Sequence, residues 1–488
     1  MLLFSDLTYP RGLPLKSTAT ILGLLCGILC ACLVTSIHGA EPATYFRSRG
    51  GLPADDQVPL PENLEDAKAL LWRVPIATGH STPCVHGDGI YVTTFDNGKL
   101  FTIAFEREAG KVRWTRECPA QKIESVHSSG SPATSSPACD GERVYAFFGS
   151  YGLLCYDLAG SLVWDKPLGP FQDEFGAASS PILWDGKLII NEDHDLGSYL
   201  LCLDATTGKE LWRTPREDAT RSYSTPVPWT AGGKKQVLVA GALQLIAYDL
   251  ETGKQQWTQE GLARIMNTTP AIADDLLIIS AWSPGGDSDA RIAMEPWAEA
   301  ARLWDKDKDG KLTREEADNK EVLDRFFRID LNQDQGLDEQ EWGRYSRVFE
   351  LARNAFMAIR PGDSSSSPPT VAWTHEKGIP YIPSPLAYRG IAYLVKDGGI
   401  VSSFDVKTGE LLKTARCRGT GTYFASPVAG DGKVYLASEK GVISVLRAGG
   451  EWETLSSRDL AERTCATPVL HEGKLFVRTE VALYCFGR

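Results

Sequence analysis

The densest group of side chains that could bind a metal lies in residues 305–316. Aspartates occupy alternate positions of this twelve-residue segment, a glycine follows the third aspartate, and a glutamate ends the segment. Alternate carboxylates of a tight loop point at one centre, and a glutamate in the twelfth position can bind through both oxygens. A cation that takes six to eight oxygen ligands fits this arrangement, so we expect calcium. The expected ligands are Asp305, Asp307, Asp309, Lys311 through its carbonyl, Thr313 through water, and Glu316.

A second twelve-residue segment, residues 330–341, repeats the pattern with one departure. Its expected ligands are Asp330, Asn332, Asp334, Gly336, Asp338 and Glu341. The glycine of the sharp turn is replaced by Gln335, and left-handed backbone at a non-glycine residue costs about 1–2 kcal/mol. A register shifted by one residue would place Trp342 at the bidentate position, which excludes that register. Both segments match EF-hand loops, and we expect the second to bind calcium more weakly or to serve only as a structural partner of the first.

Helices should flank both loops and hold them as a pair. Apolar side chains recur at helical spacing between the loops and after them, at Val322, Leu323, Phe326, Phe327, Trp342, Tyr345, Val348 and Phe349. Residues 305–341 contain 13 acidic and 7 basic residues, so their net charge of −6 is half of the chain's −12. We expect residues 287–362 to be an inserted α-helical EF-hand pair in which Leu312 pairs with its counterpart in the other loop. In a calcium-rich exterior such a site is structural rather than a sensor.

The remainder of the chain carries an internal repeat. A Ser/Thr-Pro pair occurs eight times, with prolines at positions 83, 137, 181, 226, 270, 385, 427 and 468. Successive prolines are 54, 44, 45, 44, 115, 42 and 41 residues apart, so the period is about 44 residues with one long interruption. That interruption contains the two acidic loops, so the loops belong to an insertion within the fifth repeat.

Each repeat has the pattern of four antiparallel strands. The Ser/Thr-Pro pair precedes a short apolar strand, a turn such as Asp185-Gly186-Lys187, and a second strand. A third strand, an Asp-x-x-Thr-Gly turn and a fourth strand with a tryptophan follow, which is the composition of a propeller blade. The last repeat supplies three strands, and residues 69–74 supply an orphan fourth strand. The fold class predicted is therefore all-β, an eight-bladed β-propeller closed by N- and C-terminal strands, with seven blades as the alternative.

The repeat resembles a known family. The stretch from Cys202 to Trp212, which reads CLDATTGKELW, is similar to the tryptophan-docking repeat of pyrroloquinoline-quinone-like propellers. The resemblance covers about residues 69–486 apart from the insert. It implies a propeller that is either a quinone-dependent dehydrogenase or a non-enzymatic relative such as an outer-membrane assembly lipoprotein.

The N-terminus has the features of an export signal. Residues 19–34 are apolar, basic residues precede them, and small residues end at Ala40. We interpret residues 1–40 as a signal peptide, with a retained membrane anchor or lipidation at Cys32 as alternatives. The mature chain would be periplasmic or extracellular, where its eight remaining cysteines could form disulfides. We assign residues 41–68 to a linker, 69–286 to blades one to five, 287–362 to the insert, and 363–488 to the end of blade five and blades six to eight.

The loops before the Ser/Thr-Pro pairs are the expected ligand-binding face, because propellers bind ligands at the mouth of the central channel. These loops carry His80, Tyr223, Asn267, Tyr381 and Phe424, with Arg221 and Arg264 slightly upstream. Simple loop packing is the alternative explanation of these residues. The polar run 191–195 around His194 is expected to be an exposed hairpin loop.

Composition and the absence of certain motifs exclude several classes of function. The net charge of −12 argues against nucleic acid as a partner. The mature sequence has no adjacent cysteines, no Cys-x-x-Cys-His, no nucleophile elbow and no phosphate loop, so no catalytic or cofactor-binding residue is assigned. We expect a calcium-binding scaffold that binds a protein, peptide or carbohydrate in the cell envelope or outside the cell. A pyrroloquinoline-quinone-dependent or otherwise cryptic oxidoreductase is the alternative.

Overall fold

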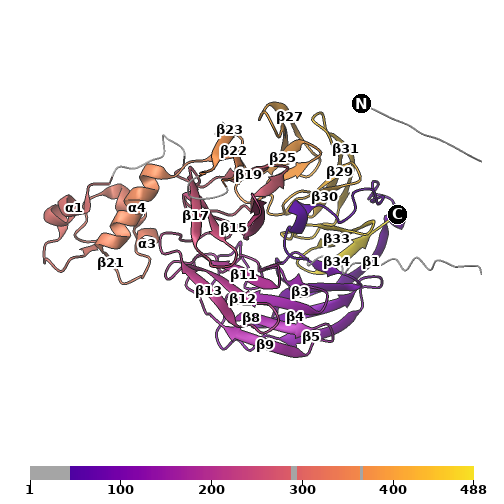
Figure 1. Ribbon diagram of the computed structural model, residues 1–488, viewed down its shortest axis with the longest axis horizontal. Coiled ribbons are helices and arrows are strands. Elements are labelled where there is room, and N and C mark those ends of the chain that lie inside the picture. The colour runs from indigo at the N-terminus through magenta and orange to yellow at the C-terminus, as the bar shows by residue number, and fades with distance from the viewer. Residues whose placement is uncertain (1–43, 287–293, 363–366) are drawn as a thin grey trace, which may run out of the picture. The chain divides into compact units, whose positions relative to one another are not determined.

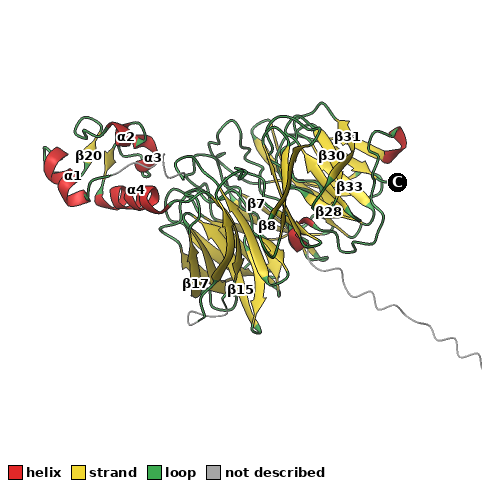
Figure 2. Ribbon diagram, turned by 90° about the horizontal axis from the view of Figure 1, so that it is seen from above, coloured by secondary structure: helices red, strands yellow, loops and turns green. Residues whose placement is uncertain are grey.

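The computed structural model describes residues 44–286, 294–362 and 367–488. Within these residues the strands form eight four-stranded antiparallel sheets that follow one another around a central axis, as a β-propeller (Figures 1 and 2). The residues interpreted as a signal peptide lie outside the described part of the chain. No helix of the described residues is long and apolar enough to cross a membrane.

Blades one to four are continuous in sequence. Their strands are β2 (Cys84–His86), β3 (Gly89–Asp96), β4 (Lys99–Glu106) and β5 (Val112–Glu117); β6 (Ala138–Cys139), β7 (Arg143–Phe148), β8 (Gly152–Asp157) and β9 (Leu162–Pro167); β10 (Ile182–Trp184), β11 (Lys187–Glu192), β12 (Tyr199–Asp204) and β13 (Glu210–Pro215); and β14 (Val227–Ala231), β15 (Lys234–Gly241), β16 (Gln244–Asp249) and β17 (Gln255–Glu260).

The fifth blade is interrupted, and the sixth and seventh are continuous. Their strands are β18 (Ala271–Ala273), β19 (Leu276–Ala281), β22 (Ala355–Arg360) and β23 (Thr370–His375); β24 (Leu386–Tyr388), β25 (Ile391–Lys396), β26 (Ile400–Asp405) and β27 (Leu411–Arg416); and β28 (Val428–Gly430), β29 (Lys433–Ala437), β30 (Val442–Arg447) and β31 (Glu453–Asp459).

Strands from both ends of the chain close the ring. The eighth blade contains β32 (Val469–His471), β33 (Lys474–Arg478), β34 (Ala482–Phe486) and, as its fourth strand, β1 (Leu70–Pro75). β1 pairs antiparallel with β34, with Trp72 opposite Cys485. The expected eight-bladed propeller and its closure by terminal strands are both confirmed, and closure leaves the ring without an open edge between its first and last blades.

Tryptophan side chains join neighbouring blades. The indole N–H of Trp164 on β9 donates to the carbonyl of Ala205 in the next blade at 3.1 Å. Trp72, Trp114, Trp212 and Trp373 donate in the same way to carbonyls of Arg107, Leu158, Leu250 and Val406. A Cβ at Gly208, whose φ is +69°, would lie 2.7 Å from the ring of Trp164. The repeated Thr-Gly turn therefore provides both left-handed backbone and room for the tryptophan of the preceding blade.

The eight Ser/Thr-Pro pairs form a closed hydrogen-bonded ring. The backbone N–H of Thr82 donates to the Ser136 hydroxyl at 2.9 Å, and each successive pair repeats this bond until Thr467 donates to Thr82 at 3.1 Å. The intervening acceptors, at 2.9–3.2 Å, are Ser180, Thr225, Thr269, Ser384, Ser426 and Thr467. The proline after each hydroxyl residue has no N–H of its own and a fixed φ. Every blade is thus fastened to its neighbour at the channel.

The segment before β1, which the sequence assigns to a linker, is packed against the propeller. It contains two short 3-10 helices, η1 (Ser48–Gly51) and η2 (Ala67–Ala69). The buried Arg47 guanidinium donates to the carbonyls of Pro427 and Pro385 at 3.2 and 2.6 Å, and the Tyr435 hydroxyl donates to the Pro61 carbonyl at 2.8 Å. This segment therefore packs against blades six to eight.

A helical insert joins β19 to β22. Its elements are α1 (Trp297–Trp304), β20 (Leu312–Thr313), α2 (Lys320–Leu323), α3 (Phe326–Ile329), β21 (Gly336–Leu337) and α4 (Glu339–Leu351). A separate apolar core fills it, including Phe326, Trp342 and Phe349. The expected boundary at residue 362 is wrong, because β22 already pairs with β19 from Ala355 onwards. The apolar strand sequence AFMAIR follows the helical pattern of α4 closely, so the sequence alone does not separate the two.

Among the eight cysteines of the described residues the structure forms no disulfide. Seven of them are buried in the blades, where they pack as small apolar side chains, and only Cys465 is partly exposed.

Candidate functional site

A cavity of about 210 Å³ lies at the mouth of the central channel. Seven of the eight ring residues line it, at Thr82, Ser136, Ser180, Thr269, Ser384, Ser426 and Thr467. Aromatic and polar side chains of the preceding loops complete the wall, at Phe46, His80, Phe175, Tyr223, Asn267, Tyr381, Phe424 and Cys465. The structure therefore brings together all five residues that the sequence placed at the channel mouth.

Hydrogen bonds hold several wall residues in place. The Tyr223 hydroxyl donates to Asp173 Oδ1 at 2.7 Å, and the Asn267 amide donates to the Tyr381 carbonyl at 3.4 Å. Trp282 packs edge-on against Tyr381, with ring centroids 5.2 Å apart. Burial lowers the pKa of His80 to about 4, so its imidazole is neutral at pH 7. The wall presents aromatic surface together with neutral hydrogen-bonding groups.

The two arginines expected near the mouth do not line this cavity. Arg221 forms ion pairs with Asp195 and Glu174, and Arg264 lines a separate small cavity of about 120 Å³. Among the described residues, the wall of the channel-mouth cavity contains no lysine or arginine.

The polar run around His194 is buried, contrary to the expectation of an exposed hairpin loop. Asp193, His194 and Asp195 are 3%, 3% and 2% exposed. Arg216 donates to both oxygens of Asp193 at 2.8 and 2.9 Å, Arg221 pairs with Asp195, and His194 stacks on Phe171 with ring centroids 3.9 Å apart. Partners that are distant in sequence compensate these charges, and no local pattern could have revealed them.

Three carboxylic acids in and beside this run are buried: Glu192 belongs to the run, whereas Glu124 and Asp173 lie outside it and were missed by sequence reasoning. Burial raises the pKa of Glu124 and of Asp173 to about 7, and raises the pKa of Glu192 well above its ordinary value with a further contribution from the charge of Glu124. Each acid has one buried oxygen without a hydrogen-bond partner in the described structure. Asp173 connects this group to the cavity wall through Tyr223.

The first acidic loop of the insert brings its aspartates together. Carboxylate oxygens of Asp305, Asp307 and Asp309 all lie within 4.8 Å of one another. Glu316 accepts hydrogen bonds from the backbone N–H of Lys306 at 3.2 Å and of Thr313 at 3.0 Å, so it closes the loop. One oxygen of Asp305 is buried and has no hydrogen-bond partner. These oxygens form a donor set that fits a hard cation.

In the second acidic loop, the expected ligand side chains form hydrogen bonds with the backbone of the loop itself. Both carboxylate oxygens of Asp330 and the side-chain oxygen of Asn332 accept hydrogen bonds from backbone N–H groups of the loop. The Glu341 carboxylate accepts hydrogen bonds from the backbone N–H groups of Leu331, Asn332 and Asp338. Gln335 has a φ of +75°, as its position in the sharp turn requires. Lys311 from the first loop forms an ion pair with Asp334, which lowers the pKa of that carboxyl. Asp338 caps α4 by accepting the Glu341 N–H at 2.9 Å.

The two loops lie side by side. β20 pairs antiparallel with β21, with Leu312 opposite Leu337, as the sequence predicted. Gly336 contributes to this pair, and its backbone lies beside the Lys311 side chain.

Comparison with known proteins agrees with the fold. An eight-bladed ring with docking tryptophans and a channel-mouth cavity defines the chain as a propeller of the pyrroloquinoline-quinone-like type. The family model described as outer membrane protein assembly factor BamB matches residues 64–192 and 196–326, and the chain belongs to this family.

A curated relative is the serine/threonine-protein kinase AfsK of Streptomyces griseus. It is 28% identical over 267 residues, which cover 48% of this chain and 30% of the kinase. The chain thus spans less than a third of the length of that relative.

Solved structures resemble the fold at low identity. BamB from Moraxella catarrhalis has a TM-score of 0.53 at 13% identity, with 86% of this chain and 99% of that chain covered. Quinohemoprotein alcohol dehydrogenase from Comamonas testosteroni has a TM-score of 0.53 at 13% identity, covering 89% and 79%. A europium-containing methanol dehydrogenase has a TM-score of 0.54 at 11% identity, covering 92% and 98%. These likenesses concern the fold.

Proposed function

We propose that this chain is an exported, calcium-binding propeller whose channel-mouth cavity binds a protein segment, a peptide or a carbohydrate in the cell envelope or outside the cell. The main support for this proposal is the set of side chains that line the cavity. Rings of Tyr223, Tyr381 and Phe424 stand beside hydroxyl and amide groups, a combination that suits the apolar faces and hydrogen-bonding edges of peptides and sugars. The family description, an outer membrane protein assembly factor, favours a protein partner. Export is supported by the apolar residues 19–34.

The insert supplies the calcium sites in this proposal. The converging aspartates of the first loop, its closing glutamate and the paired strands between the loops support assignment as an EF-hand pair. The ion pair between Lys311 and Asp334 must open before a cation can use Asp334, so the second loop binds more weakly.

Site-directed photo-crosslinking tests the binding face. A photoreactive phenylalanine analogue replaces Phe424 at the cavity, or the exposed Leu162 on the outer strand β9 as the matched control. Irradiation in the producing cells should yield a defined adduct from position 424 and none from position 162. Tyr381→Ala should reduce that adduct several-fold, because it removes a neighbouring ring from the wall. Adducts from position 162 alone would contradict the proposed face.

A quinone-dependent oxidoreductase is the second candidate, favoured by the likeness of the fold to quinoprotein dehydrogenases. Pyrroloquinoline quinone is a planar tricarboxylate, and its carboxylates need cationic partners when buried. The described wall of the cavity contains no lysine or arginine, and its histidine is neutral. The residues present therefore do not fit this cofactor, and we derive no reaction through it.

A further inference from the structure

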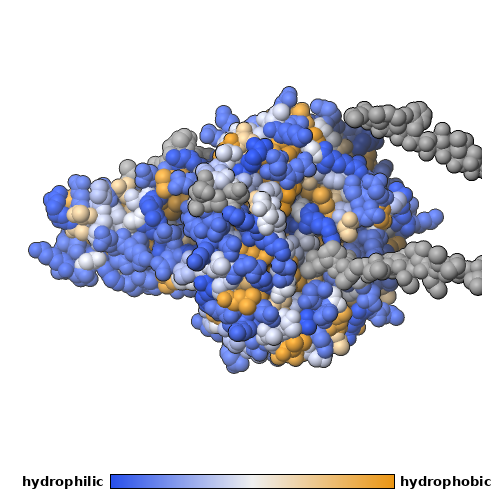
Figure 3. Space-filling view, in the orientation of Figure 1, coloured by the Kyte–Doolittle hydropathy of each residue, from blue (hydrophilic) through white to orange (hydrophobic). Residues whose placement is uncertain are grey.

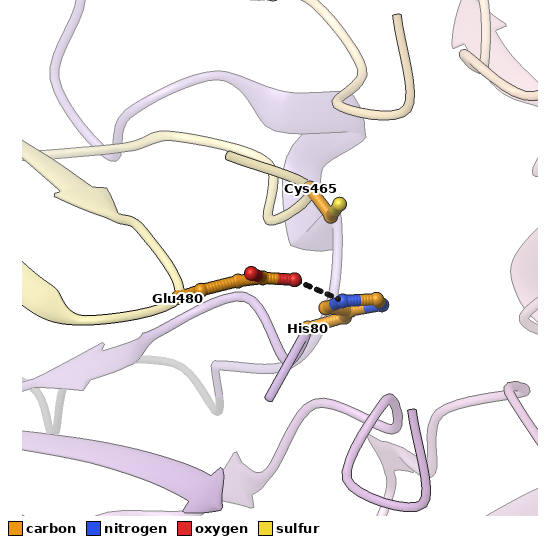
Figure 4. A group of neighbouring side chains, drawn as sticks. All are labelled: His80, Cys465 and Glu480. Carbon is orange, nitrogen blue, oxygen red and sulfur yellow. Dashed lines mark hydrogen bonds and ion pairs between the residues drawn. The ribbon is translucent and has the colours of Figure 1, made fainter. Parts of the chain in front are cut away.

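Three metal-ligating side chains converge at the edge of the channel-mouth cavity. His80 comes from the loop between β1 and β2, Cys465 from the loop between β31 and β32, and Glu480 from the turn between β33 and β34. One nitrogen, the sulfur and one carboxylate oxygen all lie within 4.8 Å of one another. Glu480 and His80 point toward each other and Cys465 lies beside them, each on a different part of the ribbon (Figure 4). Only the closed ring, which joins both ends of the chain, brings them together.

The ligand types select the metal. A thiolate, an imidazole and a carboxylate are the ligands of zinc, with metal–ligand distances of about 2.0–2.3 Å. In a tetrahedral site these distances separate the ligand atoms by about 3.3–3.8 Å. His80 Nε2 already lies 3.3 Å from Glu480 Oε1, so only the thiol of Cys465 has to move closer. Calcium and magnesium prefer all-oxygen sites and do not suit this set.

Neighbouring charges are compatible with a divalent cation. Arg463 forms ion pairs with both Glu480 and Glu439, so it keeps Glu439 when Glu480 turns to a metal. Arg478 is fully buried and donates to the Ser81 carbonyl at 3.0 Å. One thiolate and one carboxylate together offset the charge of a divalent ion.

Two of the three ligands also line the cavity. His80 and Cys465 belong to its wall, and all three side chains are partly exposed rather than enclosed. A site with three protein ligands and one position facing a cavity is an open site. We propose that His80, Cys465 and Glu480 bind one zinc-type metal ion, whose fourth position faces the cavity and takes water or a donor atom of a bound ligand. Metal binding at this site requires neither the calcium loops nor the partner proposed above.

Cobalt titration tests the site directly. The purified protein, reduced, chelator-treated and then saturated with calcium so that the acidic loops are filled, is titrated with Co²⁺ and afterwards with Zn²⁺. We expect one Co²⁺ per chain with a thiolate-to-cobalt charge-transfer band, which Zn²⁺ removes by displacement. Cys465→Ser should abolish the band, and Glu480→Gln should weaken cobalt binding at least about tenfold. Glu439→Gln, which removes the other carboxylate paired with Arg463, should keep the band.

Alkylation of the unmodified chain tests the same site without a variant. Zn²⁺ should slow the reaction of Cys465 with N-ethylmaleimide at least about tenfold, measured by peptide mass spectrometry. Cobalt binding without a sulfur band, or alkylation of Cys465 at the same rate with and without zinc, would overturn the proposal.

Discussion

The repeated hydroxyl residue has a role that reaches beyond its own blade. The hydroxyl of Ser180 accepts the backbone N–H of Ser136, and Ser180 in turn donates its own N–H to Thr225. The position of every such residue could be predicted from the repeat, whereas the bond between neighbouring repeats could not, because its two partners are about 44 residues apart. Serine and threonine alternate freely in this ring because only the hydroxyl is used.

Removing one hydroxyl should destabilise the ring. Ser180→Ala leaves the buried N–H of Ser136 without an acceptor, which costs about 1–3 kcal/mol. Ser180→Thr keeps the hydroxyl and should cost much less, since threonine occupies the equivalent position in other blades. Urea unfolding of both variants measures the difference. Equal losses in the two variants would show that the hydrogen bond is not the cause.

The buried acids make stability depend on pH. Burial raises the pKa of Glu124 to about 7, whereas in the unfolded chain it titrates near 4.5. Between these values the folded state holds more protons than the unfolded state, so the free energy of unfolding falls as pH rises and levels off above about pH 7. In Glu124→Gln the decline should be smaller by on the order of 1–3 kcal/mol.

The matched control for this effect is Glu117→Gln, on an exposed strand position. Urea unfolding from pH 4.5 to 7.5, with calcium present throughout, should give the unmodified pH dependence for that variant. A Glu124→Gln profile parallel to that of the unmodified chain would contradict the assignment of the buried proton to Glu124.

At the scale of elements, the strands of each blade and the two acidic loops follow patterns that are local in sequence, so they could be predicted. The first strand after the insert could not be separated from it, because AFMAIR continues an apolar pattern that began in α4. Burial of His194 could not be predicted either, since Arg216 and Arg221, which neutralise its neighbours, lie two strands further along the chain. The cluster of Cys465 and Glu480 with His80 could not be predicted, because these residues come together only when the ring closes.

Calcium affinity should depend on the glutamate that closes the first loop. Glu316→Gln removes one charge from the donor set and should weaken calcium binding at this loop at least about tenfold. The insert has its own apolar core, so the propeller should keep its cooperative unfolding transition. Calorimetric titration with calcium and thermal unfolding measure the two effects, and Glu315→Gln, at the adjacent non-ligand position, serves as control. Loss of the propeller transition in Glu316→Gln would contradict this separation.

On the scale of the whole molecule, closure by β1 and β34 positions everything at the channel mouth. The ring of hydroxyls forms one surface of the cavity, the loops before all eight blades place residues around it, and the N-terminal segment contributes Phe46. The number of blades and their closure follow from counting repeats, and five of the seven predicted mouth residues meet in the cavity, whereas Arg221 and Arg264 do not line it. The packing of the segment before β1 could not be read from its composition, since its contacts with blades six to eight span more than 300 residues.

The central claim is that this propeller is a calcium-binding module that binds a partner rather than a quinone enzyme. Calorimetric titration of calcium into the chelator-treated protein, followed by pyrroloquinoline quinone in the same sample, tests it most directly. We predict calcium binding that Glu316→Gln weakens, and no quinone binding, because the cavity wall provides no cationic partner for its carboxylates. Tight quinone binding would contradict the account and make the oxidoreductase the better description, and the absence of calcium binding would remove the role assigned to the insert.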